Sequence, residues 1–286
     1  MVWRLTVHPG PTVGVVVATR RRADLLARCI QALVEQDTDQ GYEVVVVNDD
    51  DTPVSLAQHE VVRVVPGPCR GVAAARNVGI AATTAPLIAF TDDDAVPSRG
   101  WISAMVAASE RYPDAVAFDG PIETGPLDPL YHHAPEAVPG SLVTANAVYR
   151  RRTLETVGLF DERFHGFWGL EDIELAARAA RAGPIRFVDD MIVVHPPRPI
   201  GLLELFGQGR SVEGQWMLFR THPSLSNWRL PLRWGPVLGW FRGRLRWLSP
   251  EIVRGSPARA VRAVALVVGT TAVAFWTALR RWSPPP

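Results

Sequence analysis

Two short apolar runs in the first third of this sequence each end in a cluster of acidic residues. The run at 44–47 is followed by Asn48 and three aspartates at 49–51, and the run at 87–90 is followed by Thr91 and three aspartates at 92–94. Like charges repel, and a carboxylate withdrawn from water costs free energy unless something compensates it. The chain must therefore fold so that these carboxylates meet compensating positive charge.

Short β-branched runs alternate with amphipathic stretches over the first 111 residues. We predict strands at 13–18, 43–47, 61–65 and 87–90, and helices at 24–36, 71–82 and 101–111. This alternation through short connections indicates an open parallel α/β sheet. After a weakly periodic region rich in proline and glycine at 115–140, we predict strands at 142–149, 185–188 and 191–194, and helices at 151–157 and 171–182.

Ligands of an open α/β sheet bind beyond the carboxyl ends of its strands, so both acidic clusters should face one crevice. Asp92 and Asp94 are two residues apart, so their side chains point the same way in an extended segment, while Asp93 points elsewhere. Mg²⁺ typically takes one or two carboxylates together with substrate phosphates. The pair therefore suits a divalent cation bound to phosphate, and the alternative is a solvated acidic turn.

Other charged residues can likewise be interpreted either as ligand-binding residues or as structural ones. A carboxylate within 48–51 could accept a hydrogen bond from a nucleobase, or the segment could form an Asx turn. The arginines at 20–22, together with Arg70 and Arg76, suit phosphate, or they are solvated surface residues. His195 follows a predicted strand, where it is either structural or a metal ligand if that strand abuts the triple aspartate.

Glu171 and Asp172 open the predicted helix at 171–182. Acidic residues in a first helical turn complement the helix dipole. The functional alternative is a general base, which would deprotonate an acceptor hydroxyl held against the aromatic residues of the preceding loop.

Six segments occur in order: ATRRRADLLARCIQAL, EVVVVNDDD, RGVAAARNVGIAAT, LIAFTDDDAVP, NAVYRRRTLETVGLFDERFHGFWGLEDIELAARAARAG and VVHPPRP. Together, over about 13–195, they resemble glycosyltransferase family 2. The resemblance implies a GT-A fold, which is a Rossmann-like mixed sheet flanked by helices. It also implies metal-dependent, inverting transfer of a sugar from a nucleotide-diphosphate donor, most often a UDP-sugar, to a hydroxyl of a glycan such as a cell-envelope polysaccharide, a glycolipid or another acceptor. The stretch GFWGLED is further similar to the GWGGED loop of galactosyltransferase-like enzymes.

The resemblance also implies roles for individual residues. Asp172 matches the catalytic base, with Glu171 beside it. The donor-binding set is Thr19, Arg21, Asp49, Arg76, Asn77, Asp92 and Asp93, and the acceptor-binding set is Asn146, Phe167 and Trp168. A divalent cation, Mn²⁺ or Mg²⁺, would be held by Asp92, Asp94 and His195. The family's usual DDGS is replaced by the residues 48–51, and its usual Tyr and Asn after the first Thr are replaced by Arg20 and Arg21.

The region 199–286 differs in charge and composition from the predicted catalytic domain at 1–198. It holds 12 arginines against 3 glutamates, a net charge of +9, whereas the rest of the chain carries −8. Seven of the ten tryptophans lie here, interleaved with arginine, and 263–279 is a stretch of 17 uncharged residues. Such a helical region suits an anionic membrane surface. The alternatives are a helix buried against the body or in a homodimer.

Several classes of protein are disfavoured. Basic and aromatic residues can also bind nucleic acid, but helical apolar spacing favours lipid, so we expect no nucleic-acid partner. No secretory signal is visible, and Cys29 and Cys69 lack metal-ligand spacing, so a cytoplasmic location is expected, peripheral or anchored at the cytoplasmic face of the membrane. A nucleotidyltransferase would need a glycine-rich loop bearing lysine, and this chain has no lysine. A non-catalytic, membrane-recruited nucleotide-sugar binding module is the remaining alternative.

Overall fold

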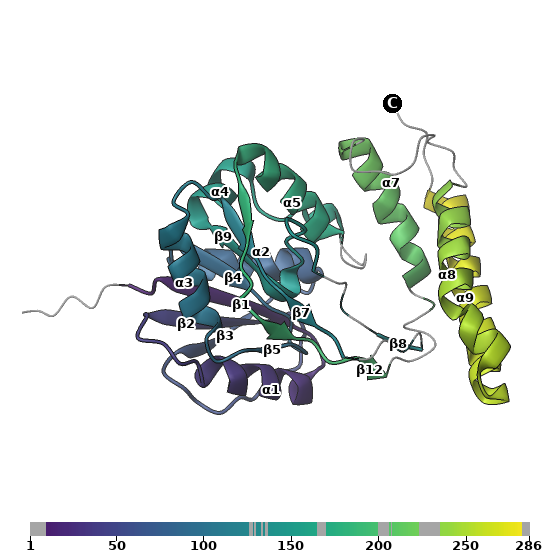
Figure 1. The fold of residues 1–286 in the computed structure, drawn as a ribbon, viewed down its shortest axis with the longest axis horizontal. Helices are drawn as coiled ribbons and strands as arrows, with labels where there is room; N and C mark the ends of the chain where they lie inside the picture. The colour runs from purple at the N-terminus through teal and green to yellow at the C-terminus, as the bar shows by residue number, and fades with distance from the viewer. Residues whose placement is uncertain are drawn as a thin grey trace, which may run out of the picture.

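The computed structural model describes residues 10–125, 128, 130–132, 134, 137–164, 170–199, 206, 208–222 and 235–281. An α/β body formed by the first two thirds of the chain is followed by the helices α7 (Ser211–Thr221), α8 (Gly235–Arg254) and α9 (Pro257–Arg281), which lie at one end of the molecule (Figure 1).

A seven-stranded mixed sheet forms the centre of the body. Its order is β10-β6-β9-β4-β1-β2-β3. The strands are β1 (Val13–Thr19), β2 (Tyr42–Asn48), β3 (Val62–Pro66), β4 (Leu87–Phe90), β6 (Ala117–Asp119), β9 (Ala147–Arg150) and β10 (Ile185–Phe187). β1 pairs in parallel with both β2 and β4, so the carboxyl ends of these three strands meet at one edge.

Helices cover both faces of this sheet because the buried strands are apolar on both sides. On β1, Val15 and Val17 pack in one core with α1 (Ala23–Val34) and α3 (Trp101–Arg111). Val16, between them, packs in the opposite core with α2 (Val72–Ala82), α4 (Arg151–Val157) and α5 (Glu171–Ala182). Gly79 lets α2 approach the sheet closely, because an added Cβ there would collide with the Val16 side chain.

The structure confirms the alternation of strands and helices predicted over the first 111 residues. The all-parallel arrangement predicted from alternation is wrong, because β9 pairs antiparallel with β4 and with β6. The mixed sheet implied by the family resemblance is the one observed. The predicted strand at 142–149 is correct only in its second half, since a 3₁₀ turn, η1 (Thr144–Asn146), precedes β9. Leu142 has a φ of 48°, which is not a strand conformation, and the 3₁₀ turn follows it, so the strand begins only after Asn146.

Two small sheets extend the body beside the carboxyl ends of the central strands. The first contains β5 (Val96–Pro97), β11 (Val193–Val194) and β7 (Ile122–Glu123), and the second contains β12 (Arg198–Pro199) and β8 (Tyr131–His132). β12 begins at Arg198, so the boundary predicted after that residue falls inside a paired strand.

The C-terminal part consists of η3 (Gln208–Arg210), α7 (Ser211–Thr221), α8 (Gly235–Arg254) and α9 (Pro257–Arg281). It contacts the body at several places among the described residues. His222, after α7, bonds to Glu174 of α5, and Leu130 packs into a small core shared by α8 and α9. A second 3₁₀ turn of the body, η2 (Glu162–Phe164), contributes Phe164 to a core with Leu218 of α7.

Candidate active site

The loops after β1, β2 and β4 converge at one edge of the central sheet because these strands run parallel. They bring together Thr19, Asp49 and the three aspartates at 92–94. Both acidic clusters therefore lie at the same edge of the sheet, as expected from the sequence.

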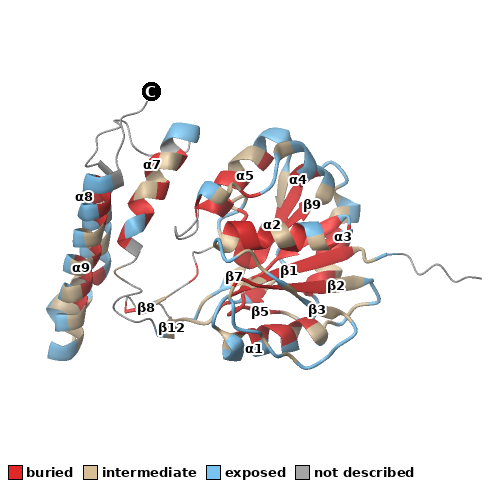
Figure 2. Ribbon diagram, turned by 180° about the vertical axis from the view of Figure 1, so that it is seen from behind, coloured by how far each residue is buried: buried red, intermediate tan, exposed pale blue. Residues whose placement is uncertain are grey.

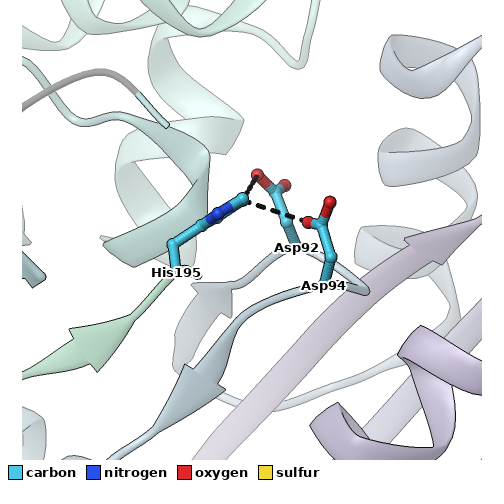
Figure 3. A group of neighbouring side chains, drawn as sticks. All are labelled: Asp92, Asp94 and His195. Atoms are coloured by element: carbon cyan, nitrogen blue, oxygen red, sulfur yellow. Dashed lines mark ion pairs between the residues drawn. The ribbon is translucent and has the colours of Figure 1, made fainter. Parts of the chain in front are cut away.

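Asp92, Asp94 and His195 form a compact group of metal-ligand atoms (Figure 3). One oxygen of each carboxylate and one imidazole nitrogen lie within 4.8 Å of one another. His195 Nε2 is 3.0 Å from Asp94 Oδ1 and 3.9 Å from Asp92 Oδ2. Asp93 lies outside this group. The extended segment expected at 92–94 is wrong, because residues 93–94 form a turn that is closed by a hydrogen bond of 3.1 Å from the Ala95 N–H to the Asp92 carbonyl.

Strand pairing brings His195 to the aspartates across about a hundred residues of sequence. β11 ends at Val194, which pairs with Val96 of β5, two residues after Asp94. The backbone N–H of His195 donates to the Glu123 carbonyl at 2.8 Å, which continues the pairing of β11 with β7. The His195 side chain is 2% exposed, so neighbouring residues enclose it.

Each ligand carboxylate is shared between an arginine and the histidine. Asp92 Oδ1 accepts from Arg76 at 3.1 Å, while its Oδ2 faces His195. Asp94 Oδ2 accepts from Arg198 at 3.1 Å, and Arg22 lies 3.5 Å away. The outer oxygen of each aspartate is therefore fixed by an arginine, and the inner oxygens turn toward one point.

These contacts shift the pKa values of the ligands. Burial disfavours the charged form of Asp94, but His195, Arg22 and Arg198 outweigh it and lower the pKa of Asp94. Burial likewise opposes a charge on His195, yet the Asp94 carboxylate raises the pKa of His195. Asp94 is thus held in the ionised form that binds a metal.

The donor set fits a divalent cation. Two carboxylate oxygens and an imidazole nitrogen are ligands that Mn²⁺ and Mg²⁺ accept, and three protein ligands leave positions for a substrate phosphate. The other imidazole nitrogen, Nδ1 of His195, is buried and has no hydrogen-bond partner among the described residues. The predicted metal set, Asp92, Asp94 and His195, is therefore one cluster in space.

Thr19 and Asp93 lie directly beside this cluster. The Thr19 hydroxyl donates to Asp93 Oδ2 at 2.7 Å, and Arg22 donates to Asp93 Oδ1 at 3.1 Å. Burial raises the pKa of Asp93 to about 6, against the opposing effects of Arg22 and Thr19. Both were predicted to bind the donor, and here their polar atoms bind each other at the floor of the site.

Asp49 is buried at the end of β2 with one oxygen unused. Its Oδ2 accepts from the Gly71 N–H at 3.0 Å, at the start of α2. Its Oδ1 has no partner among the residues that the structure describes, although Asp49 is only 4% exposed. A buried acceptor without a donor costs free energy, so this oxygen is suited to an N–H group of a bound ligand.

Glu171 and Asp172 enter the site from the first turn of α5 and are 3% and 4% exposed. Arg76 bridges the two regions, because its guanidinium contacts Glu171 Oε1 at 2.6 Å as well as Asp92. Burial, and next to it the neighbouring Glu171, raise the pKa of Asp172 well above that of an ordinary carboxyl. Asp172 is therefore suited to hold a proton.

Three predicted site residues have side chains that form hydrogen bonds or ion pairs with other residues of the protein. The Asn77 amide bonds to both backbone groups of Phe160 and to Glu162. The Asn146 amide accepts from Trp101 and donates to two backbone carbonyls, and this residue is 1% exposed. Arg21 is exposed, has a φ of 56°, and pairs with Asp50 at 2.6 Å. Asn77 and Asn146 thus hold loops around the site, and ligand contacts by all three remain predictions.

The other two predicted acceptor residues, Phe167 and Trp168, lie outside the described residues. The GWGGED-like loop therefore remains a prediction.

Two residues at the centre were not predicted from the sequence. Arg198 follows His195 by three residues in VVHPPRP. This short separation in the sequence could have indicated that Arg198 lies near the histidine. His132 lies in β8 opposite Arg198 and its ring packs 6.1 Å from the His195 ring, centre to centre. Burial and the adjacent Arg198 lower the pKa of His132 to about 4. The sequence did not predict a role for His132, because the region 115–140 is weakly periodic and no strand was expected there.

A central mixed sheet flanked by helices, with this strand order, is the GT-A fold. Solved structures share this fold. Mannosyltransferase PcManGT from Pyrobaculum calidifontis, solved with GDP-Man and Mn²⁺, superposes over 97% of this chain and 82% of its own, with a TM-score of 0.52 and 18% identity. TarS 1-349 from S. aureus, solved with UDP, superposes over 96% and 93%, with a TM-score of 0.54 and 13% identity.

Sequence comparison identifies the family. The model described as glycosyl transferase family 2 matches residues 14–171, more than half of the chain. The chain therefore belongs to glycosyltransferase family 2, as the order of its motifs predicted. It is similar to the pre-mycofactocin glycosyltransferase of Mycobacterium tuberculosis, with 30% identity over 223 residues. That match covers 67% of this chain and 45% of the relative, so the chain spans about half of that protein's length.

Proposed function

We propose that this protein transfers a sugar from a nucleotide-diphosphate donor to a hydroxyl group, with inversion at the anomeric carbon. The observation that carries the proposal is the cluster of Asp92, Asp94 and His195, linked through Arg76 to Glu171 and Asp172. One end of this array suits a diphosphate and the other suits an acceptor proton. The family to which the chain belongs supports the same reaction class.

Asp92, Asp94 and His195 would hold a divalent cation, which when bound supplies charge neutralisation for a leaving diphosphate. Arg76, fixed between Asp92 and Glu171, adds a buried positive charge on the same side. Asp172 would accept the proton of the attacking hydroxyl. Its raised pKa favours proton uptake, and Glu171 next to it orients Arg76.

The nucleotide would lie over the ends of β1 and β2. The buried Oδ1 of Asp49 is the acceptor available to a base N–H, which the rings of uracil, guanine and thymine all carry. Among these we propose a UDP-sugar as donor, in line with the family resemblance. The structural neighbours were solved with UDP in one case and GDP-Man in the other, so a donor screen must include both bases.

The acceptor is proposed to be a glycan or a lipid-linked carbohydrate, such as a cell-envelope polysaccharide precursor, presented at the cytoplasmic face of a membrane. The basic, tryptophan-rich region 199–286 supports this location. One described helix, at Pro257–Arg280, is long and apolar enough to cross a membrane by length and composition alone. Self-association into a homodimer is the alternative use of the same region.

The test is a thermal-shift screen of UDP-, GDP- and dTDP-sugars with and without Mn²⁺. We expect one donor to stabilise the wild-type protein only when Mn²⁺ is present, because the cation would link diphosphate to Asp92 and Asp94. The variant Asp92→Asn with Asp94→Asn should lose this shift. The matched control is Asp189→Asn with Asp190→Asn, a pair of adjacent exposed aspartates outside the site, which should keep it.

Stabilisation by a donor in the absence of metal, or its retention in the Asp92/Asp94 variant, would contradict the proposed cation site. A protein that binds a donor but never hydrolyses or transfers its sugar would be a binding module instead.

A further inference from the structure

The hairpin formed by α8 and α9 presents an uncharged stripe on its outer side. In both views of the fold α7 lies between the body and this hairpin, so the hairpin stands at the edge of the molecule (Figures 1 and 2). Along α9 the exposed residues recur every three or four positions, at Val261, Val264, Val268, Ala272, Phe275 and Leu279. Val261 is 70% exposed and Val268 is 63% exposed. Such spacing places them on one face of the helix.

The opposite face of α9 is used inside the protein. Ala263, Leu266 and Val267 pack against Leu248 of α8 and against Leu130 of the body. Farther along, Ala274 and Ala278 pack against Val237 of α8 and Val212 of α7. One face of α9 is therefore packed inside the protein and the other is exposed to solvent, although the central sequence of the helix is almost uniformly apolar.

The pairing of α8 with α9 argues against a membrane-crossing helix. Contacts at Leu248 and at Val237 bracket the segment of α8 that carries Arg242, Arg244 and Arg246. This segment must then lie beside the middle of the uncharged stretch 263–279. If α9 crossed a bilayer in this arrangement, three arginines would be carried to the depth of its hydrocarbon core, where charged side chains are costly.

Charge decides between a lipid surface and a second copy of the chain. The segment 235–281 holds eight arginines and one glutamate, Glu251, whose carboxylate is bound by Arg259 at 2.6 Å. A second copy would bring the same excess of positive charge against the stripe. An anionic surface complements it. Trp276, 54% exposed and stacked 4.0 Å from the Arg280 guanidinium, has the amphipathic character of residues at lipid headgroups.

We propose that the outer face of the α8–α9 hairpin lies in the plane of an anionic lipid bilayer, with the stripe of α9 in the interface and the arginines of α8 at the headgroups. This deepens the membrane location proposed above by naming the surface and its orientation. It stands apart from the sugar-transfer proposal, because its test contains neither donor nor metal.

The test is co-sedimentation of the full-length protein with vesicles of phosphatidylcholine alone or with 25% phosphatidylglycerol (about one lipid in four, to supply the negative charge). We expect partition onto the anionic vesicles, released by high salt, and little onto neutral ones. Val264→Asp with Val268→Asp should reduce the partition coefficient at least tenfold. Val64→Asp is the control, because Val64, on β3, is 42% exposed and Val264 is 45% exposed. Circular dichroism establishes that each variant is folded.

A second variant, Arg242→Gln with Arg246→Gln, removes charge without touching the stripe, and should weaken binding to anionic vesicles only. The proposal is overturned if the wild type ignores both vesicles, or if Val64→Asp loses as much binding as the stripe variant. It is also overturned if the protein resists extraction by salt and alkaline carbonate, as a spanning helix does. A wild-type dimer that the stripe variant dissociates, with no vesicle binding, would assign the face to a second copy.

Discussion

In the site, each of the aspartates Asp92 and Asp94 uses one carboxylate oxygen for an arginine and has the other directed toward His195. Arg76 occupies one oxygen of Asp92, and Arg198 one oxygen of Asp94, so that only the inner oxygens face His195. The question raised by three adjacent aspartates thus has a physical answer in this chain. Arginines and a histidine from three separate segments compensate them, and Asp93 is buried against Thr19 and Arg22. The cluster is preorganised for a cation because its outer atoms are already bonded.

Asp172 permits a prediction about pH. Burial and Glu171 raise its pKa above the unfolded value of 3.8. Its contribution to the free energy of unfolding is therefore fully present below pH 3.8 and is lost as pH rises through the folded pKa. An asparagine at this position carries no charge at any pH. Asp172→Asn should therefore gain stability over wild type between pH 5 and pH 9, by at least about 1.4 kcal/mol, which corresponds to a tenfold change in a protonation equilibrium. Urea unfolding at the two pH values measures this.

The same substitution should reduce sugar transfer by about 100-fold or more, because a general base contributes that much. The wild-type rate should rise with pH through the folded pKa of Asp172, as its unprotonated form becomes populated. Asp190→Asn, at an exposed position, should change neither property. An Asp172→Asn protein of normal activity would remove Asp172 from the role of base.

Helices around the site are joined by side chains that form hydrogen bonds with backbone carbonyls and with each other. Arg178 of α5 donates to the carbonyls of Val157, Gly158 and Leu159, which end α4, and it also pairs with Glu174. Glu174 in turn bonds to His222 after α7 at 2.9 Å. Two helices, α4 and α7, thus meet on α5, the helix that carries Glu171 and Asp172. The orientation of the proposed base therefore depends on contacts two turns away along α5.

Arg178→Lys tests this arrangement. Lysine keeps the charge but offers a single ammonium group in place of the planar fork, so it cannot reach three carbonyls and a carboxylate together. We expect a loss of about 1–3 kcal/mol in the free energy of unfolding, measured by chemical denaturation. Arg181→Lys, on the exposed face of the same helix, should stay within about 0.5 kcal/mol of wild type. Equal effects of the two substitutions would show that the Arg178 contacts contribute little.

At the scale of the whole molecule, the segment around β8 connects the C-terminal hairpin with the proposed metal site. Leu130 is 2% exposed in the core of the hairpin, and Asp128 pairs with Arg259 of α9 at 3.0 Å. His132, two residues after Leu130, lies against His195. The hairpin and the proposed metal site are thus separated by one short strand. The position of the hairpin and the order of the site should be coupled through it.

Leu130→Ala should loosen the hairpin without unfolding the sheet. Removing a buried leucine side chain costs about 2–5 kcal/mol, and the Leu130 side chain packs mainly against α8 and α9. We expect amide hydrogen exchange in α8, α9 and 131–132 to accelerate by more than about tenfold, while exchange in β1, β2 and β4 is unchanged. Leu130→Met keeps the volume and serves as control. Uniform acceleration across the sheet would mean that the hairpin and body unfold together.

Local patterns in the sequence were sufficient for the strands and helices of the first 111 residues and for the meeting of both acidic clusters at one edge of the sheet. These features depend on side-chain period and on neighbours within a few residues, which periodicity reports directly. The antiparallel β9, the approach of Arg198 and His132 to His195, and the packing of Arg242–Arg246 beside the apolar stretch of α9 were decided by the tertiary structure. Each of these depends on which distant elements pair and in what register, and the free energy of such pairing is gained only when the whole core assembles.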